Sequence, residues 1–470
     1  MSSNPLAAQK LAADPRIAEA KSLILAALKE HQSVLNEVKI ADPTLTVGYQ
    51  QQLDHFAKLR GGSLYFPYIS SGLGNGPFVE LADGSVKLDM ITGIGVHGYG
   101  HSNPELVEAG IDAALSDTVM QGNLQQNGAS VELCELLVQT ASQSGSMIAH
   151  CMLSTSGAMA NENSLKMAFQ KNFPAYRVFA FENCFCGRTI ALSNITDRPG
   201  YRAGLPVTTT VDYLPFYDHN DPEGSLEKTM SVFERQVARY PGQHAILWME
   251  LIAGEGGYYP GTEAYFKALC ARAKELGIAI ICDEVQTFAR TSRPFAFQHF
   301  NLDSLVDIVT IGKISQVCAT LFTTEYTPKP GLVSQTFTGS SWAILSGLKI
   351  VKGLIERGHF HSDPSQSKNM KLHQIFVDGI QKVADKYPGS LSGPHGLGGM
   401  VALTPFDGSA EVAKDLAMRL YHAGLMSFIA GGSPYRVRFL MPLGATQTKH
   451  IDLACEILDK VVGEMVASRV

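Results

Sequence analysis

Short runs of consecutive apolar residues alternate with helical patterns between residues 105 and 325, and this alternation limits the possible folds more than any other feature. The runs occupy residues 150–154, 177–181, 245–251, 278–283 and 307–312. Unbroken apolar runs of this length are typical of strands that are buried on both faces, as in a parallel sheet covered by helices. We therefore predict an α/β fold with a mostly parallel sheet covered by helices.

The segments on either side of this central part have different patterns. Residues 16–40 have the spacing of an amphipathic helix, residues 60–104 are rich in glycine and turn signals, and residues 435–443 resemble a strand. We predict an N-terminal segment (1–104), a large α/β domain (105–345) and a C-terminal small domain (346–470). The apolar stripe of the first predicted helix contains Ile17, Leu23, Leu25, Leu28 and Leu35.

Composition narrows the class of partner and the compartment. The formal net charge is −6, without clusters of one sign, and this argues against a nucleic-acid partner because phosphate contact needs a basic face. No apolar stretch approaches the ~18 residues of a membrane-spanning helix, and the first residues lack the apolar core of a signal peptide. The eight cysteines form no CxxC pair. These features predict a reduced, cytoplasmic protein without a membrane partner.

Asp283 and Lys313 form the first candidate pair for chemistry. Each follows an apolar run, and thirty residues separate them, which is about one βαβ unit. Ligands of open parallel sheets bind outside the carboxyl ends of the strands, so both side chains are expected at the same edge. A lysine nucleophile and a carboxylate for a ring nitrogen are the two anchors of pyridoxal phosphate. The pair also fits a loop-capping aspartate and a solvated strand-end lysine.

Two loops could complete such a site. In LSTSGAMANE, a strand is followed by a turn of small residues and a helix, so Ser156, Gly157 and Ala158 could hold a phosphate at the helix N-terminus. In ENCFCGRT, Phe185 could stack on a cofactor ring and Arg188 could bind a carboxylate. A packing role alone is the more common reason for loops of either kind. No second Cys or His pair has metal-ligand spacing, so no metal is expected.

Taken together, these segments resemble the class III (ω-amino) aminotransferases of pyridoxal-phosphate fold type I over roughly residues 65–465. Eight blocks follow the family's order: GVHGYGHSNPELVEA, SGAMANE, NCFCGRT, MELIAGEGG, CDEVQTFARTSRPFAFQHF, DIVTIGK, QTFTGSSWA and YRVRFLMPL. The resemblance implies pyridoxal 5'-phosphate as cofactor, an amino acid and a 2-oxo acid as substrates, and a homodimer with shared active sites.

The resemblance also implies roles for individual residues. Lys313 would form the Schiff base and carry the proton, and Asp283 would hold the pyridine nitrogen. The other implied cofactor-binding residues are Ser156, Gly157 and Ala158 at the phosphate, Phe185 and Val285 on the ring, Gln286 at the phenolic oxygen, Glu250, and Thr336 at the phosphate of the partner subunit. Substrate-binding roles fall on Arg188, Glu255 and Arg438, with Glu255 masking Arg438 until a substrate α-carboxylate arrives.

The sequence departs from the family pattern at four positions, which are Cys186, Leu251, Ala253 and Thr338. The segment after Lys313, which contains Gln-Val-Cys at 316–318, resembles the lysine 6-aminotransferase branch. Three hypotheses remain open at this point. The first is transfer of an ω-amino group from lysine, ornithine, N-acetylornithine or 4-aminobutyrate to 2-oxoglutarate. The second is another reaction on the same scaffold (decarboxylation, racemisation or an aminomutase shift), and the third is an inactive binding protein.

Overall fold

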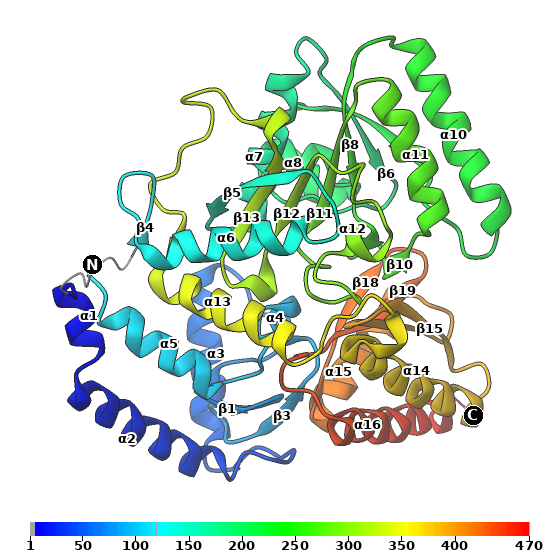
Figure 1. Ribbon diagram of the computed structural model, residues 1–470. Helices are drawn as coiled ribbons and strands as arrows, with labels where there is room; N and C mark the ends of the chain where they lie inside the picture. Colours follow the sequence, from blue (N-terminus) through cyan, green and yellow to red (C-terminus); the bar gives the residue numbers. More distant parts are fainter. Residues whose placement is uncertain (1–4, 118–119, 470) are drawn as a thin grey trace.

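The computed structural model describes residues 5–117 and 120–469, and its centre is a seven-stranded sheet. Across the sheet the strands follow the order β5, β13, β12, β11, β8, β6, β7 (Figure 1). Their bounds are β5 (Ile148–Ser154), β13 (Cys318–Thr323), β12 (Ile308–Ile311), β11 (Ala279–Glu284), β8 (His244–Met249), β6 (Arg177–Phe181) and β7 (Thr210–Leu214). All neighbouring pairs are parallel except the two that β13 makes. The predicted mostly parallel sheet is confirmed.

The apolar runs explain why this sheet lies in the middle of the molecule. Every residue of β6, β8, β11, β12 and β13 is buried. Because such strands are apolar on both faces, each face needs a cover of helices, and helices lie in front of and behind the sheet in Figure 1. They include α6 (Gly128–Ser142), α7 (Gly157–Lys171), α10 (Pro222–Arg239) and α11 (Glu263–Glu275).

The sequence patterns missed two strands of the sheet, β7 and β13. The chain between β12 and β13 contains only residues 312–317. A connection of this length is too short for the crossover that a parallel neighbour requires, so β13 returns antiparallel beside β12. Its other edge pairs with β5, again antiparallel.

The N-terminal segment contains more regular structure than its turn signals suggested. The residues expected to be turn-rich include the antiparallel strands β1 (Ser70–Asn75), β2 (Phe78–Leu81) and β3 (Val86–Asp89). The helix predicted over 16–40 is α2 (Pro15–Gln32), which ends before the C-terminal end of the predicted range. Leu23, expected on its apolar stripe, is 66% exposed, so that part of the prediction is wrong.

A second hydrophobic core joins the two ends of the chain. It contains Phe78 and Val86 from the N-terminal strands together with Leu403, Phe439 and Leu458 from the C-terminal part. The C-terminal sheet has the order β15 (Leu391–Leu397), β16 (Met400–Pro405), β19 (Tyr435–Leu440), β18 (Phe428–Gly431), and it lies beside α14 (Lys368–Lys386), α15 (Ala410–Ala423) and α16 (Thr448–Ala467) (Figure 1). The domain boundaries at 104/105 and 345/346 stay predictions.

The other helices and strands complete the described part of the chain. None of the helices in the described ranges is both long enough and apolar enough to cross a membrane. The helices are α1 (Ala7–Ala12), α3 (Thr46–Arg60), α4 (Thr92–Gly95), α5 (Pro104–Ala114), α8 (Ile190–Ile195), α9 (Pro199–Arg202), α12 (Ala296–His299), α13 (Ser341–Glu356), η1 (Lys313–Ser315), η2 (Thr324–Tyr326) and η3 (Pro364–Gln366). The strands are β4 (Met120–Gln121), β9 (Ile252–Ala253), β10 (Tyr259–Pro260), β14 (Gly339–Ser340) and β17 (Leu425–Met426).

Candidate active site

Asp283 and Lys313 lie at the same edge of the central sheet and line one cavity. Asp283 is the penultimate residue of β11, and Lys313 follows β12, its parallel neighbour. Lys313 has a left-handed backbone conformation (φ 55°) and begins the short helix η1. The cavity has a volume of about 420 Å³. Its position beyond the carboxyl ends of the strands is where open α/β sheets bind ligands.

Burial shifts the protonation of both side chains toward their neutral forms. The Asp283 carboxylate accepts hydrogen bonds from Asn161 Nδ2 at 2.8 Å and from the Val285 amide at 2.9 Å. Burial nevertheless raises the pKa of Asp283 to about 6. Burial also lowers the pKa of the Lys313 ammonium, although the charge of Asp283 opposes this shift. An amine with a lowered pKa is a better nucleophile at neutral pH.

The N-terminus of helix α7 forms a second wall of the cavity. Gly157 and Ala158 line it, and the Ser156 hydroxyl caps the helix by accepting a hydrogen bond from the Met159 amide at 3.2 Å. A Cβ atom on Gly157 would lie only 2.8 Å from a methyl carbon of Val285, so a side chain at this position would collide with the residue that follows β11. The amide groups and the positive end of this helix suit an anion such as a phosphate.

Phe185 and Arg188 come from the loop after β6, and both line the same cavity. The Phe185 amide donates a hydrogen bond to the Glu250 carboxylate at 2.8 Å. Arg188 is exposed, and its guanidinium carbon lies 3.7 Å from the centre of the Tyr201 ring. Because the guanidinium stacks on this ring, its edge stays available for a carboxylate.

Glu250 connects two loops of the site. Besides the Phe185 amide, its carboxylate accepts a hydrogen bond from the Gly254 amide at 3.0 Å. Burial, with a contribution from the nearby Asp283 charge, raises the pKa of Glu250 to about 8. The side chain therefore holds the loop that carries Phe185 against the turn that carries Glu255.

Glu255 and Arg438 form an ion pair beside the cavity. Arg438 lies on β19 and is fully buried, whereas the Glu255 side chain is 21% exposed. One terminal nitrogen of Arg438 lies 2.5 Å from the Glu255 carboxylate, and the other lies 3.4 Å from the side-chain oxygen of Gln286. Gln286 also lines the cavity, so it lies between Arg438 and the space beside Lys313. The tertiary structure joins residues that are 183 positions apart.

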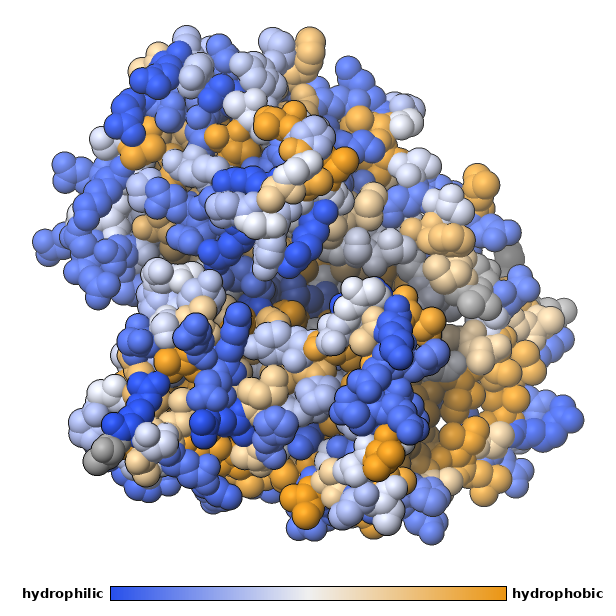
Figure 2. Space-filling view, turned by 180° about the vertical axis from the view of Figure 1, so that it is seen from behind, coloured by the Kyte–Doolittle hydropathy of each residue, from blue (hydrophilic) through white to orange (hydrophobic). Residues whose placement is uncertain are grey.

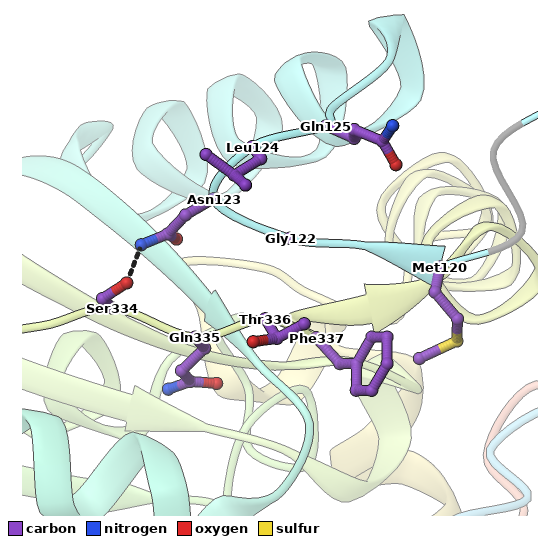
Figure 3. A pocket seen from close by; sticks show the side chains of 9 residues that line it. All are labelled: Met120, Gly122, Asn123, Leu124, Gln125, Ser334, Gln335, Thr336 and Phe337. Atoms are coloured by element: carbon purple, nitrogen blue, oxygen red, sulfur yellow. Dashed lines mark hydrogen bonds between the residues drawn. The ribbon is translucent and has the colours of Figure 1, made fainter.

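Thr336 lies in a different pocket of the same chain. This pocket has a volume of about 510 Å³ and also contains Met120, Leu124 and Phe337 (Figure 3). It is formed where the chain around β4 meets the segment before β14. The fold of a single chain therefore does not bring Thr336 to the Lys313 cavity. Ser156 does not line this cavity either, but it directly precedes Gly157, which does.

The four positions that depart from the family pattern are all buried. Cys186 lies next to the Lys313 cavity, and burial raises the pKa of its thiol well above the usual value. Leu251 and Ala253 belong to the chain that leads into the Glu255 turn, where Ala253 pairs with Tyr259 across the β9–β10 ladder. Thr338 donates its hydroxyl hydrogen to the Gln121 carbonyl at 3.2 Å.

Sequence reasoning missed several residues of the cavity, and Asn161 is the most informative. Its amide nitrogen donates hydrogen bonds to Asp283 and to the Cys186 carbonyl, so it links the carboxylate to the Phe185 loop. Its buried side-chain oxygen has no partner among the residues that the structure describes. Asn161 lies within the SGAMANE block, and a polar residue on the buried face of a helix is the signal that could have identified it. Gln316 and Cys318 also line the cavity.

The cavity combines a buried lysine, a carboxylate and a helix N-terminus, and comparisons with known proteins identify the family. The sequence profile described as Aminotransferase class-III matches residues 67–462. An acetylornithine aminotransferase from Caldanaerobacter subterraneus subsp. tengcongensis is 27% identical over 83% of this chain and 94% of its own. Another, from Bacillus subtilis, is 32% identical over 51% of this chain and 57% of its own.

Solved structures give the same result for the fold. A lysine aminotransferase from M. tuberculosis superposes with a TM-score of 0.77 and 21% identity over 88% of this chain and 99% of its own. An ornithine aminotransferase from Toxoplasma gondii superposes with a TM-score of 0.74 and 22% identity over 90% of this chain and 98% of its own. The chain belongs to the class III aminotransferase family. It is a pyridoxal-phosphate-dependent transaminase whose substrates are an amino acid and an oxo acid.

The residues of the cavity fit this cofactor. The amine of Lys313, the carboxylate of Asp283 and the amides at the start of α7 are the three kinds of group that its aldehyde, ring nitrogen and phosphate require. There is no room for a side chain at Gly157, because its Cβ would collide with Val285, and so no side chain of this residue covers its amide. No group of three or more His, Cys, Asp or Glu side chains within 5–117 and 120–469 could hold a metal ion.

Proposed function

We propose that this transaminase transfers an ω-amino group from a donor such as lysine, ornithine, N-acetylornithine or 4-aminobutyrate to 2-oxoglutarate. The observation that carries this proposal is the ion pair between the fully buried Arg438 and the partly exposed Glu255. Two kinds of substrate must use one site in such a reaction. Glutamate has a carboxylate next to its reacting amine, whereas an ω-amine has only hydrogens and carbon there.

A cation that one carboxylate can mask meets both requirements. When an ω-amine binds, Glu255 neutralises Arg438, so no unpaired guanidinium faces the apolar chain of the donor. When glutamate or 2-oxoglutarate binds, its α-carboxylate replaces Glu255 on Arg438. Arg188, exposed beside the cavity, would bind the second carboxylate of the acceptor.

The other residues of the cavity receive the following roles. Lys313 would bind the cofactor and, once free, would carry the proton between the substrate carbon and the cofactor carbon. Asp283 would keep the ring nitrogen protonated, and the ring supplies an electron sink for the substrate carbanion. The residues proposed to hold the cofactor in place are Ser156, Gly157 and Ala158 at the phosphate, Phe185 and Val285 at the ring faces, Gln286 at the phenolic oxygen and Glu250 behind the Phe185 loop.

We also propose a homodimer in which Thr336 binds the cofactor phosphate of the partner subunit. Thr336 lies apart from its own cavity, next to the exposed side chains of Leu124 and Phe337 (Figure 3). Figure 2 shows further apolar surface at its lower right, the side on which the N-terminal helices lie, and exposed Leu23 and Leu59 belong to these helices. Contiguous exposed apolar surface of this kind is typical of protein interfaces.

A donor screen tests the proposed substrate class. The purified holoenzyme is incubated with 2-oxoglutarate and one amine at a time, and glutamate formation is measured. We expect glutamate from at least one ω-amino donor. Lysine and N-acetylornithine are tested first, because a structural neighbour is named a lysine aminotransferase and a relative in sequence is named an acetylornithine aminotransferase. Glutamate formation from α-amino donors alone, such as alanine or aspartate, would overturn the proposal.

For the compartment, we propose the cytoplasm. All eight cysteine side chains are free. Disulfides are rare where glutathione and thioredoxin keep thiols reduced, and a chain with eight unpaired thiols is compatible with such a compartment.

A further inference from the structure

Strand β19 carries two arginines on one face, although the proposed mechanism uses only one of them. Arg436 and Arg438 are two residues apart, so their side chains point to the same side of the sheet. Val437 and Phe439 point to the other side, into the second hydrophobic core. Arg436 is 3% exposed, and Arg438 is fully buried.

The two arginines differ in their partners. Arg438 has the Glu255 carboxylate, whereas no ion pair with a carboxylate is found for Arg436 within residues 5–117 and 120–469. One terminal nitrogen of Arg436 donates to the Gly257 carbonyl at 2.5 Å, and its guanidinium carbon lies 3.8 Å from the centre of the Tyr259 ring. Its Nε is buried and, like that of Arg438, has no hydrogen-bond partner within the described ranges. A buried guanidinium without a counter-ion is costly, so this arrangement needs an explanation.

Among the residues that the structure describes, the titratable groups that act on Arg436 do not provide a counter-ion. Tyr259 and His395 interact with it electrostatically, and neither is a carboxylate. Burial, together with the charge of Arg436, lowers the pKa of His395 to about 4, so this imidazole is neutral near pH 7. Burial also lowers the pKa of Arg436 to about 10, although the interaction with Tyr259 opposes this shift.

The Glu255 turn lies against both arginines, and its backbone is held in place. The Glu255 carbonyl accepts hydrogen bonds from Arg198 at 2.7 Å and from the Gly431 amide at 2.8 Å. Gly257, two residues further, has a left-handed φ of 115° and its carbonyl is bound by Arg436. Because the backbone is fixed on both sides, the part of Glu255 that can move is its side chain.

We propose that Arg436 is a positioning residue that receives the Glu255 carboxylate when a substrate α-carboxylate takes its place on Arg438. The backbones of Arg436 and Arg438 lie about 6.6–6.8 Å apart along the strand, and Arg436 already contacts Gly257, two residues from Glu255. The proposed movement is therefore a rotation of the flexible Glu255 side chain, with its backbone in place. Glu255 then has a guanidinium partner in both positions. In the second position, Arg436 gains the counter-ion that it lacks in the first.

This inference rests on the proposed masking of Arg438, and it adds that the loss of Arg436 should weaken the binding of dicarboxylates. Without Arg436, a displaced Glu255 carboxylate would stand without a cation in a partly buried place. Unmasking Arg438 would then be less favourable, and dicarboxylates would bind more weakly. Donors that leave Glu255 on Arg438 would bind as before. Arg436 therefore tunes the affinity for the acceptor and not for the ω-amine.

Binding of glutarate to the holoenzyme tests this inference without turnover. Glutarate has the two carboxylates of the acceptor but no carbonyl group, so it cannot react. Calorimetry is expected to show about tenfold weaker glutarate binding for Arg436→Gln than for the unchanged enzyme. Arg436→Lys keeps the positive charge and should stay within about threefold of the unchanged enzyme. Equal melting temperatures of the variants control for folding, and Arg436→Lys remains informative if Arg436→Gln does not fold.

The same measurement in the Glu255→Gln background separates the inference from its rivals. Glu255→Gln should bind glutarate more tightly than the unchanged enzyme, and adding Arg436→Gln should then change nothing, because no carboxylate remains to be received. A tenfold loss that persists in this background would show that Arg436 contacts the ligand or only supports the fold, and would overturn the inference. If Arg436→Gln alone has no effect while Glu255→Gln still tightens binding, only this inference fails. If Glu255→Gln does not tighten glutarate binding, Glu255 does not mask Arg438, and both the proposed masking and this inference are wrong.

Discussion

Replacement of Glu255 by glutamine gives the sharpest test of the proposed substrate class. Glutamine has nearly the same shape but cannot neutralise a cation, so Arg438 would remain charged and unmasked. The Arg438–carboxylate contact is 2.5 Å long, the arginine is fully buried and the glutamate side chain is 21% exposed. A hydrogen bond between charged groups contributes about 1.5–3 kcal/mol, and we take the lower half of this range because the carboxylate is partly exposed.

A loss of about 1.4 kcal/mol corresponds to a tenfold change in rate or affinity. We therefore expect kcat/KM for the ω-amino donor to fall about tenfold or more in Glu255→Gln, because the donor now meets an unpaired guanidinium. The half-reaction with glutamate should be as fast as in the unchanged enzyme or faster, because Arg438 is already free for its α-carboxylate. The two half-reactions should thus change in opposite directions.

Single-turnover absorbance measurements of each half-reaction provide the assay. Glu275→Gln is a suitable control, because Glu275 forms an ion pair with Arg272 at 2.8 Å on the exposed surface. Ion pairs of this kind contribute little, so the loss of this one should matter far less than the loss of the buried Arg438 pair. It should leave both half-reactions unchanged. A parallel decrease of both half-reactions in Glu255→Gln, together with a lower melting temperature, would refute the masking of Arg438 and leave Glu255 as a residue that only stabilises its turn.

Four further predictions concern the cofactor site, the dimer and stability. Lys313→Ala should lose nearly all turnover and the visible absorbance of the lysine-bound cofactor, and turnover at the original rate would contradict its role. Asp283→Asn should still bind the cofactor but lose most activity, which spectra and steady-state rates will show together. Mixing inactive Lys313→Ala with an inactive Thr336→Ala variant should restore part of the activity if sites are shared, and no recovery after verified subunit exchange would count against sharing. Burial raises the pKa of Glu284 to about 8, above its value near 4.5 in an unfolded chain. The stability that comes from the protonated Glu284 is therefore fully present below pH 4.5 and is lost as the pH rises to 8. Denaturant unfolding of Glu284→Gln should show a smaller loss of stability between pH 5 and pH 8 than unfolding of the unchanged protein.

Local sequence patterns determined the class of fold and the position of the central pair. A strand buried on both faces is mostly apolar, so β6, β8, β11 and β12 were recognisable one by one. Parallel neighbours end at the same edge, and for this reason Asp283 and Lys313 could be placed together from their positions after two strands. The helix N-terminus at Gly157 also followed from local signals, namely a strand, a turn of small residues and an amphipathic helix.

The tertiary structure alone decided which distant side chains meet. Nothing local in the sequence shows that Glu255 touches Arg438, that Asn161 bridges Asp283 and the Phe185 loop, or that Thr336 lies outside the cavity of its own chain. The direction of β13 and the exposure of Leu23 were also beyond the reach of local patterns. The physical reason is that periodicity reports which face of one element is buried. Contacts between elements depend instead on how elements that are distant in the sequence pack together, and that is set by the packing of the whole chain.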